Sequence, residues 1–274
     1  MTGENRNILN RILRNWPKGT VGTLAWFRDH GGYQQLLDYY QKAPWVTKIG
    51  SGAYIQYGDA VDWRGGLYAV QNQLSLCVHV GGKTALELSG FGHNLQLGQT
   101  AKIYLFASGK IQLPTWFIKH PWEDELCFKR LNVFQSRPDF GLMHFNTGNF
   151  EIKGSAPERA MLELCTLVPN YHSFEEAGHF MESLLSLRCE YVQTLLESCN
   201  SIKAKRLFLY FADTYNMPWF QKLDIKNIDL GKGKRQVAAN GILNKKYQIT
   251  VPNLQKEISD KMGLLRVPSR NVND

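Results

Sequence analysis

The stretch "YQQLLDYYQKAPWVTKIGSGAYIQY", residues 33–57, holds a helical pattern followed by a hairpin pattern. In its first part, apolar residues such as Leu36 and Tyr40 lie four apart, so they share one face of a helix. Pro44 ends that helix, because proline has no N–H to continue the helical hydrogen bonds. Two short apolar segments then flank the turn Gly50-Ser51-Gly52. The stretch therefore predicts a helix followed by a β-hairpin.

Two more short helices are predicted upstream of this stretch. The segment "NILNRILRNWP", residues 7–17, repeats apolar residues at the i, i+3 and i+4 spacing of an amphipathic helix. A second helix is expected to start near Thr23, whose hydroxyl can cap a helix N-terminus, and to end at the Gly31-Gly32 break. Three short helices and a hairpin within residues 1–58 form the layout of a winged helix-turn-helix, a DNA-binding domain.

The polar side of the third helix carries side chains that can read base edges in a major groove. Glutamine can pair with adenine, lysine can contact guanine or phosphate, and aspartate can accept from the cytosine amino group. Threonines at the second helix would touch phosphate, and a lysine and a serine would place the wing. The predicted DNA contacts are Thr20, Thr23, Gln34, Gln35, Asp38, Gln41, Lys42, Lys48 and Ser51. The alternative, a polar helix face that is merely solvated, stays open.

The composition is that of a folded globular protein, with 43% hydrophobic and 20% charged residues among 274. No apolar run reaches the roughly 18 residues of a membrane span, and the N-terminus has no secretory pattern, so we expect a cytoplasmic protein without membrane contact. The five scattered cysteines and seven dispersed histidines form no C-x-x-C or H-E-x-x-H pattern. We therefore expect no disulfide frame, no metal and no cofactor.

Charge is distributed unevenly along the chain. Residues 1–58 hold 7 basic and 3 acidic groups, residues 59–200 hold 11 and 15, and residues 201–274 hold 14 and 6. The three segments thus carry net charges of +4, −4 and +8, which together give the +8 of the whole chain. A basic head and a basic tail around an acidic middle favour a polyanionic partner contacted from both ends.

A second basic cluster lies in the last third of the chain. Cations in the first turns of the helix predicted after Ser201 are disfavoured by the helix dipole, and a bound phosphate would offset that cost. The predicted surface, for phosphate or RNA or for the antitoxin function, consists of Lys203, Lys205 and Arg206 in that helix and Lys232, Lys234 and Arg235 in the tail. Alternatively, nearby carboxylates such as Asp213 or Asp229 compensate these charges.

After residue 58 the pattern changes, and residues 59–274 are predicted to form a second, larger domain. Residues 59–154 alternate candidate helices with strands such as "CVHV" and "KIYLFAS", which indicates a mixed α/β part. The segment "LPTWFIKHPWEDELCFKRLNVF", residues 113–134, is predicted as strands and loops. Residues 155–274 are predicted to be mainly helical, with the basic tail at the end. The chain as a whole is therefore predicted to be α+β.

No motif in the chain predicts catalysis. Gly82-Lys83-Thr84 resembles the end of a phosphate-binding loop, but the glycine that the loop needs five positions earlier is Cys77. Asp59 and Asp62 are spaced i, i+3, so on a strand they would point to opposite faces and could not share a metal ion. We expect no catalytic residue; the alternative is a nucleic-acid-processing enzyme with an unrecognised site in residues 59–274.

Several motifs in consistent order, over roughly residues 8–252, resemble the AbiEi-family antitoxins of type IV toxin–antitoxin systems. They include "WPKGTVGTLAWFRDHG", "WVTKIGSGAYIQYGDAVDWRGGLYAVQ", "VHVGGKTALELSG", "SAPERAMLELCTLVP", "KAKRLFLYFAD" and "KYQITVP". The resemblance implies a winged helix-turn-helix repressor fused to a C-terminal antitoxin domain. Two positions depart from the basic pattern of that family, with Ser51 at the wing tip and Asp38 on the third helix.

The resemblance also implies partners. The protein would bind inverted repeats in double-stranded DNA upstream of its own operon and repress it, as a monomer or a weak dimer that could bind cooperatively. It would antagonise a neighbouring nucleotidyltransferase toxin without forming a stable complex; the alternative is a C-terminal domain that binds the toxin directly. Operons of this kind commonly serve in phage defence by abortive infection.

Overall fold

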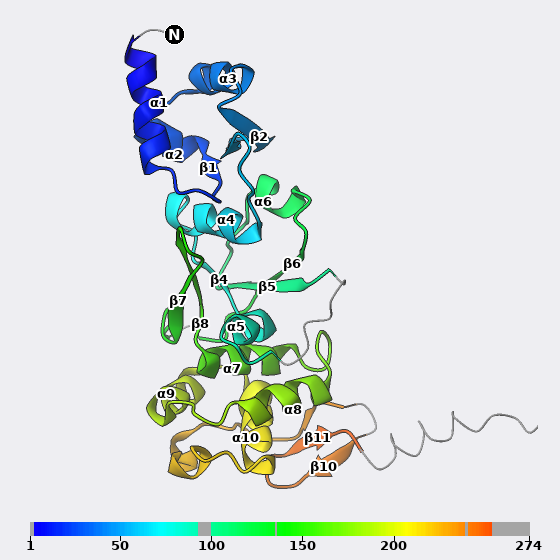
Figure 1. Ribbon diagram of the computed structural model, residues 1–274. Helices are drawn as coiled ribbons and strands as arrows, with labels where there is room; N and C mark the ends of the chain where they lie inside the picture. Colours follow the sequence, from blue (N-terminus) through cyan, green and yellow to red (C-terminus); the bar gives the residue numbers. More distant parts are fainter. Residues whose placement is uncertain (1–2, 93–99, 135, 239–240, 254–274) are drawn as a thin grey trace, which may run out of the picture. The chain divides into compact units, whose positions relative to one another are not determined.

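The structure is a computed structural model that describes residues 3–92, 100–134, 136–238 and 241–253 (Figure 1). Its internal contacts divide the chain into two compact units, Met1–Ala160 and Met161–Asp274. Both units combine helices with small sheets, so the predicted α+β class is confirmed. The boundary predicted after residue 58 falls inside the first unit, and the end of the basic tail, residues 254–274, lies outside the described residues.

Residues 3–58, which we call the head, contain three helices and a three-stranded antiparallel sheet (blue in Figure 1). The sheet order is β1-β3-β2, and Gly52, at φ +69°, completes the tight turn between β2 and β3. The elements are α1 (Gly3–Asn15), β1 (Gly22–Thr23), α2 (Leu24–Asp29), α3 (Gln34–Lys42), β2 (Val46–Gly50) and β3 (Ala53–Gln56). The predicted helices and hairpin are confirmed, and their arrangement is consistent with a winged helix-turn-helix.

The head has a core of its own, built from one side of each helix. The Trp16 and Phe27 rings meet edge to face with centroids 4.9 Å apart, which fixes α2 against the end of α1. Thr23 caps α2, because its hydroxyl oxygen accepts from the backbone N–H of Trp26. The buried core side chains are Leu9, Ile12, Trp16, Phe27, Leu36, Leu37, Tyr40, Val46 and Tyr54. These residues place α3 on the outside of the head.

The rest of the first unit, residues 59–160, forms a mixed five-stranded sheet with short helices; we call it the sheet region. The strand order is β6-β5-β4-β8-β7, with β5·β6 and β4·β8 parallel and β4·β5 and β7·β8 antiparallel. The strands are β4 (Val78–Val80), β5 (Lys102–Ala107), β6 (Glu125–Arg130), β7 (Leu142–Asn146) and β8 (Glu151–Ser155). The helices are α4 (Trp63–Tyr68), continued by a π-helical turn (Ala69–Gln73), α5 (Gly82–Leu88) and α6 (Thr115–Lys119).

Helix α6 corrects the prediction of strands and loops for residues 113–134. It is only five residues long, too short to show a helical period, and it starts directly after Pro114. Trp116 and Phe117 on α6 are buried in the core of the sheet region. The strand β6 in the same segment agrees with the prediction.

The head and the sheet region are joined by side chains that bind backbone groups. The Gln73 amide accepts from Thr23 N at 2.8 Å and donates to Val21 O at 2.8 Å. Asp59 Oδ2 accepts from Gly19 N at 2.7 Å. Because these bonds all cross from one part to the other, the head and the sheet region form one compact unit.

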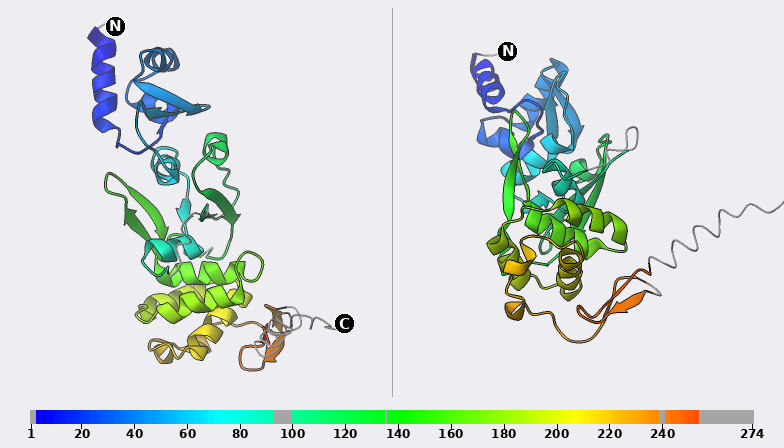
Figure 2. Two further views of the ribbon diagram at one scale, coloured as in Figure 1. Left: turned by 45° about the vertical axis from the view of Figure 1, so that its right-hand side comes forward. Right: turned by 60° about the horizontal axis from the view of Figure 1, so that its bottom comes forward.

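In its described part, the second unit consists largely of helices. Helix α7 (Pro157–Leu167) leads into it, followed by α8 (Phe174–Ser183), α9 (Cys189–Ser198) and α10 (Ile202–Thr214). Two 3₁₀ turns, Phe220–Lys222 and Ile225–Asn227, precede a small sheet of β9 (Arg235–Gln236), β10 (Ile242–Asn244) and β11 (Ile249–Val251). The sheet order is β10-β11-β9, and Figure 2 shows these strands beside the packed helices.

We predict that Gln73→Ala lowers the free energy of unfolding by about 1–3 kcal/mol, because it removes the partners of the Thr23 N–H and the Val21 carbonyl. Urea unfolding followed by circular dichroism measures the change. Asn72→Ala is the matched control; its exposed side chain bonds only within its own helix, so a change below about 0.5 kcal/mol is expected. Equal effects of the two substitutions would contradict the role assigned to Gln73.

Candidate nucleic-acid interface

Helix α3 presents its polar side to solvent. Leu36, Leu37 and Tyr40 are buried on the opposite side, which holds the helix in the core of the head. Of the side chains predicted to read bases, Gln35, Asp38, Gln41 and Lys42 are exposed and Gln34 is half-buried. The apolar and polar sides predicted for this helix are thus confirmed, and the DNA contacts of these residues stay predictions.

Gln34, Asp38 and Tyr54 form a short hydrogen-bonded chain at the start of α3. The Gln34 Nε2 donates to Asp38 Oδ1 at 3.0 Å and to the Tyr54 hydroxyl at 3.0 Å. Because a carboxylate only accepts hydrogen bonds, the nitrogen of the Gln34 amide has to face Asp38. With both amide hydrogens used, Gln34 retains only its Oε1 acceptor. The pair Gln34 and Asp38 therefore offers a base acceptors and no donor.

The wing is held rigidly on one side and exposed on the other. A Cβ atom on Gly50 would lie 2.5 Å from the Cβ of Trp116, so only glycine allows this close packing of β2 on α6. At the turn, the Gly52 carbonyl accepts from the backbone N–H of Leu24 at 2.8 Å. Lys48 and Ser51 are exposed, as a wing that contacts DNA requires.

Thr20 and Thr23 are placed differently from the expectation that they touch phosphate. Both are buried. The Thr20 hydroxyl donates to Pro17 O at 2.6 Å, and the Thr23 hydroxyl caps α2. The structure therefore gives these two threonines structural roles, and they are left out of the interface.

Four large aromatic residues on α3 and at the two ends of the hairpin are exposed. Tyr33 and Tyr39 lie at the start and on the exposed side of α3, and Trp45 directly precedes β2. Tyr57, 65% exposed, follows β3, and its backbone N–H donates to Trp45 O at 3.0 Å. Their exposure could not be read from the sequence, because aromatic residues at such positions usually pack in a core.

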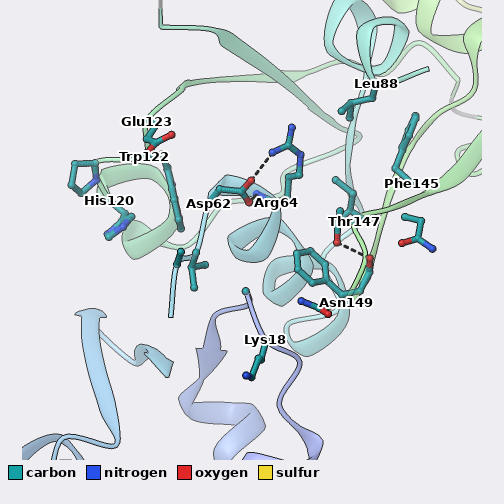
Figure 3. Close-up of a pocket in the computed structure, with 17 residues that line it drawn as sticks. Lys18, Asp62, Arg64, Leu88, His120, Trp122, Glu123, Phe145, Thr147 and Asn149 are labelled. Atoms are coloured by element: carbon teal, nitrogen blue, oxygen red, sulfur yellow. Dashed lines mark hydrogen bonds and ion pairs between the residues drawn. The ribbon is translucent and has the colours of Figure 1, made fainter. Parts of the chain in front are cut away.

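The first unit also contains an open cleft of about 880 Å³. Figure 3 shows Asp62 and Arg64 at the start of α4, with His120, Trp122 and Glu123 to one side and Thr147 and Asn149 from the β7–β8 turn to the other. Burial lowers the pKa of His120. Ten further residues complete the lining, among them Lys18 from the loop before β1, Leu88 and Phe145.

The two aspartates that opened the question of a metal site hold the backbone instead. Asp59 binds the Gly19 N–H, as described above. Asp62 caps α4 by accepting from the N–H groups of Arg64 and Gly65, and it also pairs with the Arg64 guanidinium at 2.5 Å. Within the described ranges, no group of three or more His, Cys, Asp or Glu side chains could hold a metal ion.

The cations of α10 have partners inside the second unit. The Arg206 guanidinium donates to four backbone carbonyls, those of Leu230, Gly231, Gly233 and Gln248, at 2.5–3.1 Å. Burial, reinforced by the charge of Arg235, lowers the pKa of Arg206, and the Asp229 carboxylate opposes this shift. Nearly all of its surface is covered, with 3% exposed.

Lys203 and Lys205 are also directed inward. Lys203 Nζ donates to the carbonyls of Thr166 and Val168, at the C-terminal end of α7, where the helix dipole favours a cation. Lys205 is buried. The α10 cations therefore serve packing rather than a phosphate surface. The charges of Lys203 and Arg206 are compensated by backbone carbonyl oxygens and not by a ligand or by Asp213. In the tail, Lys232 and Lys234 are exposed and Arg235 is half-buried.

The three helices and the hairpin of the head are consistent with a winged helix-turn-helix, a domain found in many transcriptional regulators. Residues 5–97 match the family described as "Transcriptional regulator, AbiEi antitoxin N-terminal domain", and residues 100–252 match "Transcriptional regulator, AbiEi antitoxin, Type IV TA system". The chain belongs to the AbiEi antitoxin family of type IV toxin–antitoxin systems, and the resemblance seen in its sequence is confirmed.

Among solved structures, the crystal structure of the RV2827C protein from Mycobacterium tuberculosis is similar, with a TM-score of 0.59 over 96% of each chain. The two sequences are 14% identical, so this likeness concerns the fold alone. No curated protein matches the sequence. Across the part of the chain that the structure describes, no helix combines the length and apolar character needed to cross a membrane.

We predict that Arg206→Met lowers the free energy of unfolding of the protein by more than about 3 kcal/mol, because it leaves four carbonyls without their charged donor. Urea unfolding followed by tryptophan fluorescence is suitable, since Trp219 is buried in this unit. Lys234→Met likewise replaces a cation by methionine, but at an exposed position, and should shift stability by less than about 0.5 kcal/mol. A small effect of Arg206→Met would show that the loop carbonyls are satisfied without it.

Proposed function

We propose that the protein is an autorepressor that binds double-stranded DNA through α3 and the wing of its head. The observation that carries this proposal is the two-sided character of α3, whose apolar side is locked in the head core while its polar side is exposed. The target would be inverted repeats upstream of its own operon. Its place of action would be the cytoplasm, where that DNA lies.

The charges of the head support a DNA contact. Lys42 at the end of α3 and Lys48 on β2 are exposed, and residues 1–58 carry a net charge of +4. Lysines at the border of a recognition surface bind phosphates and release counterions, which gives affinity without sequence information. Gln35, Asp38 and Gln41 lie on the same exposed side and can supply the base contacts.

We further propose that the protein antagonises a nucleotidyltransferase toxin encoded beside it, without a stable complex. Membership of the AbiEi antitoxin family supports this part of the proposal. Co-expression with the adjacent gene should restore growth, while size-exclusion chromatography of the mixture should show two separate peaks. Co-elution of the two proteins would contradict the indirect mechanism and indicate a direct complex.

The first prediction for DNA binding concerns the two ends of the exposed side of α3. Gln35→Ala with Lys42→Ala should weaken binding to duplex DNA from upstream of the gene by at least about tenfold, because a base contact and a phosphate contact are lost. Electrophoretic mobility shift at two salt concentrations measures the effect, and the salt dependence should become less steep by roughly one counterion. Gln221→Ala with Lys222→Ala, an exposed pair in the second unit, should leave binding unchanged. Unchanged binding by the α3 variant would contradict the assignment of the recognition helix.

The second prediction concerns base preference. Because Asp38 and Gln34 present only acceptors, Asp38 should accept from the amino group of a cytosine. Selection from a pool of randomised duplexes should yield a motif with one C·G pair that Asp38→Asn shifts toward A·T, since asparagine pairs with adenine. The preference at that pair should change roughly tenfold while the other positions stay as they are.

Asp29→Asn, the same chemical change on an exposed carboxylate at the end of α2, is the control and should select the unaltered motif. A motif that Asp38→Asn leaves unchanged would refute the cytosine contact while leaving DNA binding intact. A pool in which no motif is enriched would refute the proposed function itself.

A further inference from the structure

The loop between the last 3₁₀ turn and β9 has an unusual backbone. Gly231 and Gly233 have positive φ angles of 62° and 73°, and neither Lys232 nor Lys234 has a positive φ. Backbones that alternate in this way turn successive N–H groups toward one side and form a concave anion-binding surface, called a nest. Glycine at both positive-φ positions makes the conformation accessible without strain.

Arg206 determines which way the peptide groups of this loop face. Its guanidinium donates to the carbonyl oxygens of Leu230, Gly231 and Gly233 at 2.7, 2.9 and 2.5 Å. In a planar trans peptide the N–H points opposite to the carbonyl. The N–H groups of Lys232 and Lys234, which follow Gly231 and Gly233, therefore point away from Arg206.

The first N–H group of the loop already binds a carboxylate. The Gly231 N–H, which follows the Leu230 carbonyl, donates to the carboxylate oxygen Asp229 Oδ1 at 2.8 Å. The loop thus already holds one anionic oxygen at its beginning. The backbone N–H groups of Lys232, Gly233 and Lys234 donate no hydrogen bond to any of the described residues.

The charges around the loop also favour an anion. The side chains of Lys232 and Lys234 are exposed. Arg235 curls back over the loop and donates from Nη1 to the carbonyls of Lys232 and Lys234, which brings its positive charge close. Four cations, with Arg206 counted, thus belong to this loop or bind it, against one carboxylate, that of Asp229.

We propose that residues 231–234 form a binding site for a phosphate group. The N–H groups of Lys232 and Lys234 would donate to its oxygens, and the two lysine ammonium groups would neutralise its charge. Arg206 acts as a positioning residue beneath the loop, because its bonds to the carbonyls hold the N–H groups outward. The site lies in the second unit and does not depend on DNA binding by the head.

Asp229 is the internal competitor of the proposed ligand. Its carboxylate occupies the first N–H of the loop and repels a phosphate nearby. Replacing it by asparagine keeps a hydrogen-bond acceptor for Gly231 N but removes the negative charge. Asp229→Asn should therefore bind phosphate more tightly, a change that no loss of folding could produce.

The test follows the backbone amide NMR signals of residues 231–234 in the full chain during titration with inorganic pyrophosphate. These signals should shift, with Lys232 and Lys234 among the largest changes. Lys232→Ala with Lys234→Ala should weaken binding about tenfold or more, whereas the matched pair Lys222→Ala with Lys226→Ala, exposed in the two 3₁₀ turns, should change it less than about twofold. Asp229→Asn should strengthen it about threefold.

The source of the phosphate is settled by two further titrations. A single-stranded RNA oligonucleotide that shifts the same amides more strongly than ATP would identify a nucleic-acid backbone, and the reverse would identify a free nucleotide. Amide signals that stay in place with pyrophosphate at about 10 mM would overturn the proposal. Equal losses in the two lysine pairs would also overturn it, because they would show diffuse attraction to a basic surface instead of a site.

Discussion

The hydrogen bonds that one side chain makes to the short strand β1 determine how the first unit is assembled. β1 has two residues and pairs with β3, and the Gln73 amide binds the backbone at Val21 and Thr23. A primary amide can donate and accept in one plane, so it completes the hydrogen bonding of β1 as a neighbouring strand would. Helix α2 starts at the residue after β1. Fixing β1 on the π-helical turn therefore also fixes the head on the sheet region.

The wing depends on the same arrangement. β3 pairs with β1 on one side and with β2 on the other, so any movement of β1 is transmitted to the hairpin. Close packing of Gly50 on Trp116 then secures the far end of β2. Because the wing is held at both places, Lys48 and Ser51 are presented by a rigid element, as precise contacts to a partner require.

In the second unit, a charged side chain also binds backbone groups that have no neighbouring strand. The loop that contains Gly231 and Gly233 has no strand partner for its carbonyls, and the guanidinium of Arg206 supplies five donors from one position. Burying that charge is costly unless its donors are satisfied, and four carbonyls satisfy four of the five. The consequence is directional, because carbonyls that face inward leave the peptide N–H groups facing outward.

Local patterns were sufficient to predict the parts of the fold that depend on neighbouring residues. The spacing of Leu36 and Tyr40, the stop at Pro44 and the glycines of the turn predicted α3 and the hairpin, and the structure confirms both. The five-residue helix α6 was missed, since it is shorter than two helical turns. Boundaries between the parts of the fold were harder to predict, because Asp59 binds Gly19 and Gln73 binds the backbone at β1 over 40 to 52 residues of sequence.

In the candidate site, too, the sequence predicted what depends on neighbouring residues and missed what depends on distant ones. Exposure of Asp38 and Lys42 followed from the helical wheel, but the burial of Thr20 and Arg206 did not. A residue type reveals which hydrogen bonds a side chain can make, but not which group arrives from a distant segment to make them. The carbonyls that accept hydrogen bonds from Arg206 lie 24 to 42 residues further along the chain. No pattern around residue 206 could reveal them, so a structural arginine resembled a ligand-binding one.

An acidic residue at the centre of a proposed DNA-reading helix has a physical consequence for specificity. A carboxylate repels phosphates, so Asp38 lowers the affinity of a head that otherwise carries a positive net charge. It also repels the acceptor groups of guanine and thymine in the major groove, and so penalises the wrong base pair. Gln34, itself bound to the Tyr54 hydroxyl, restrains this carboxylate through its hydrogen bond, so the carboxylate cannot easily turn away to relieve the repulsion. Since specificity is a difference between two affinities, a residue that weakens binding to most sequences can still sharpen the choice of one.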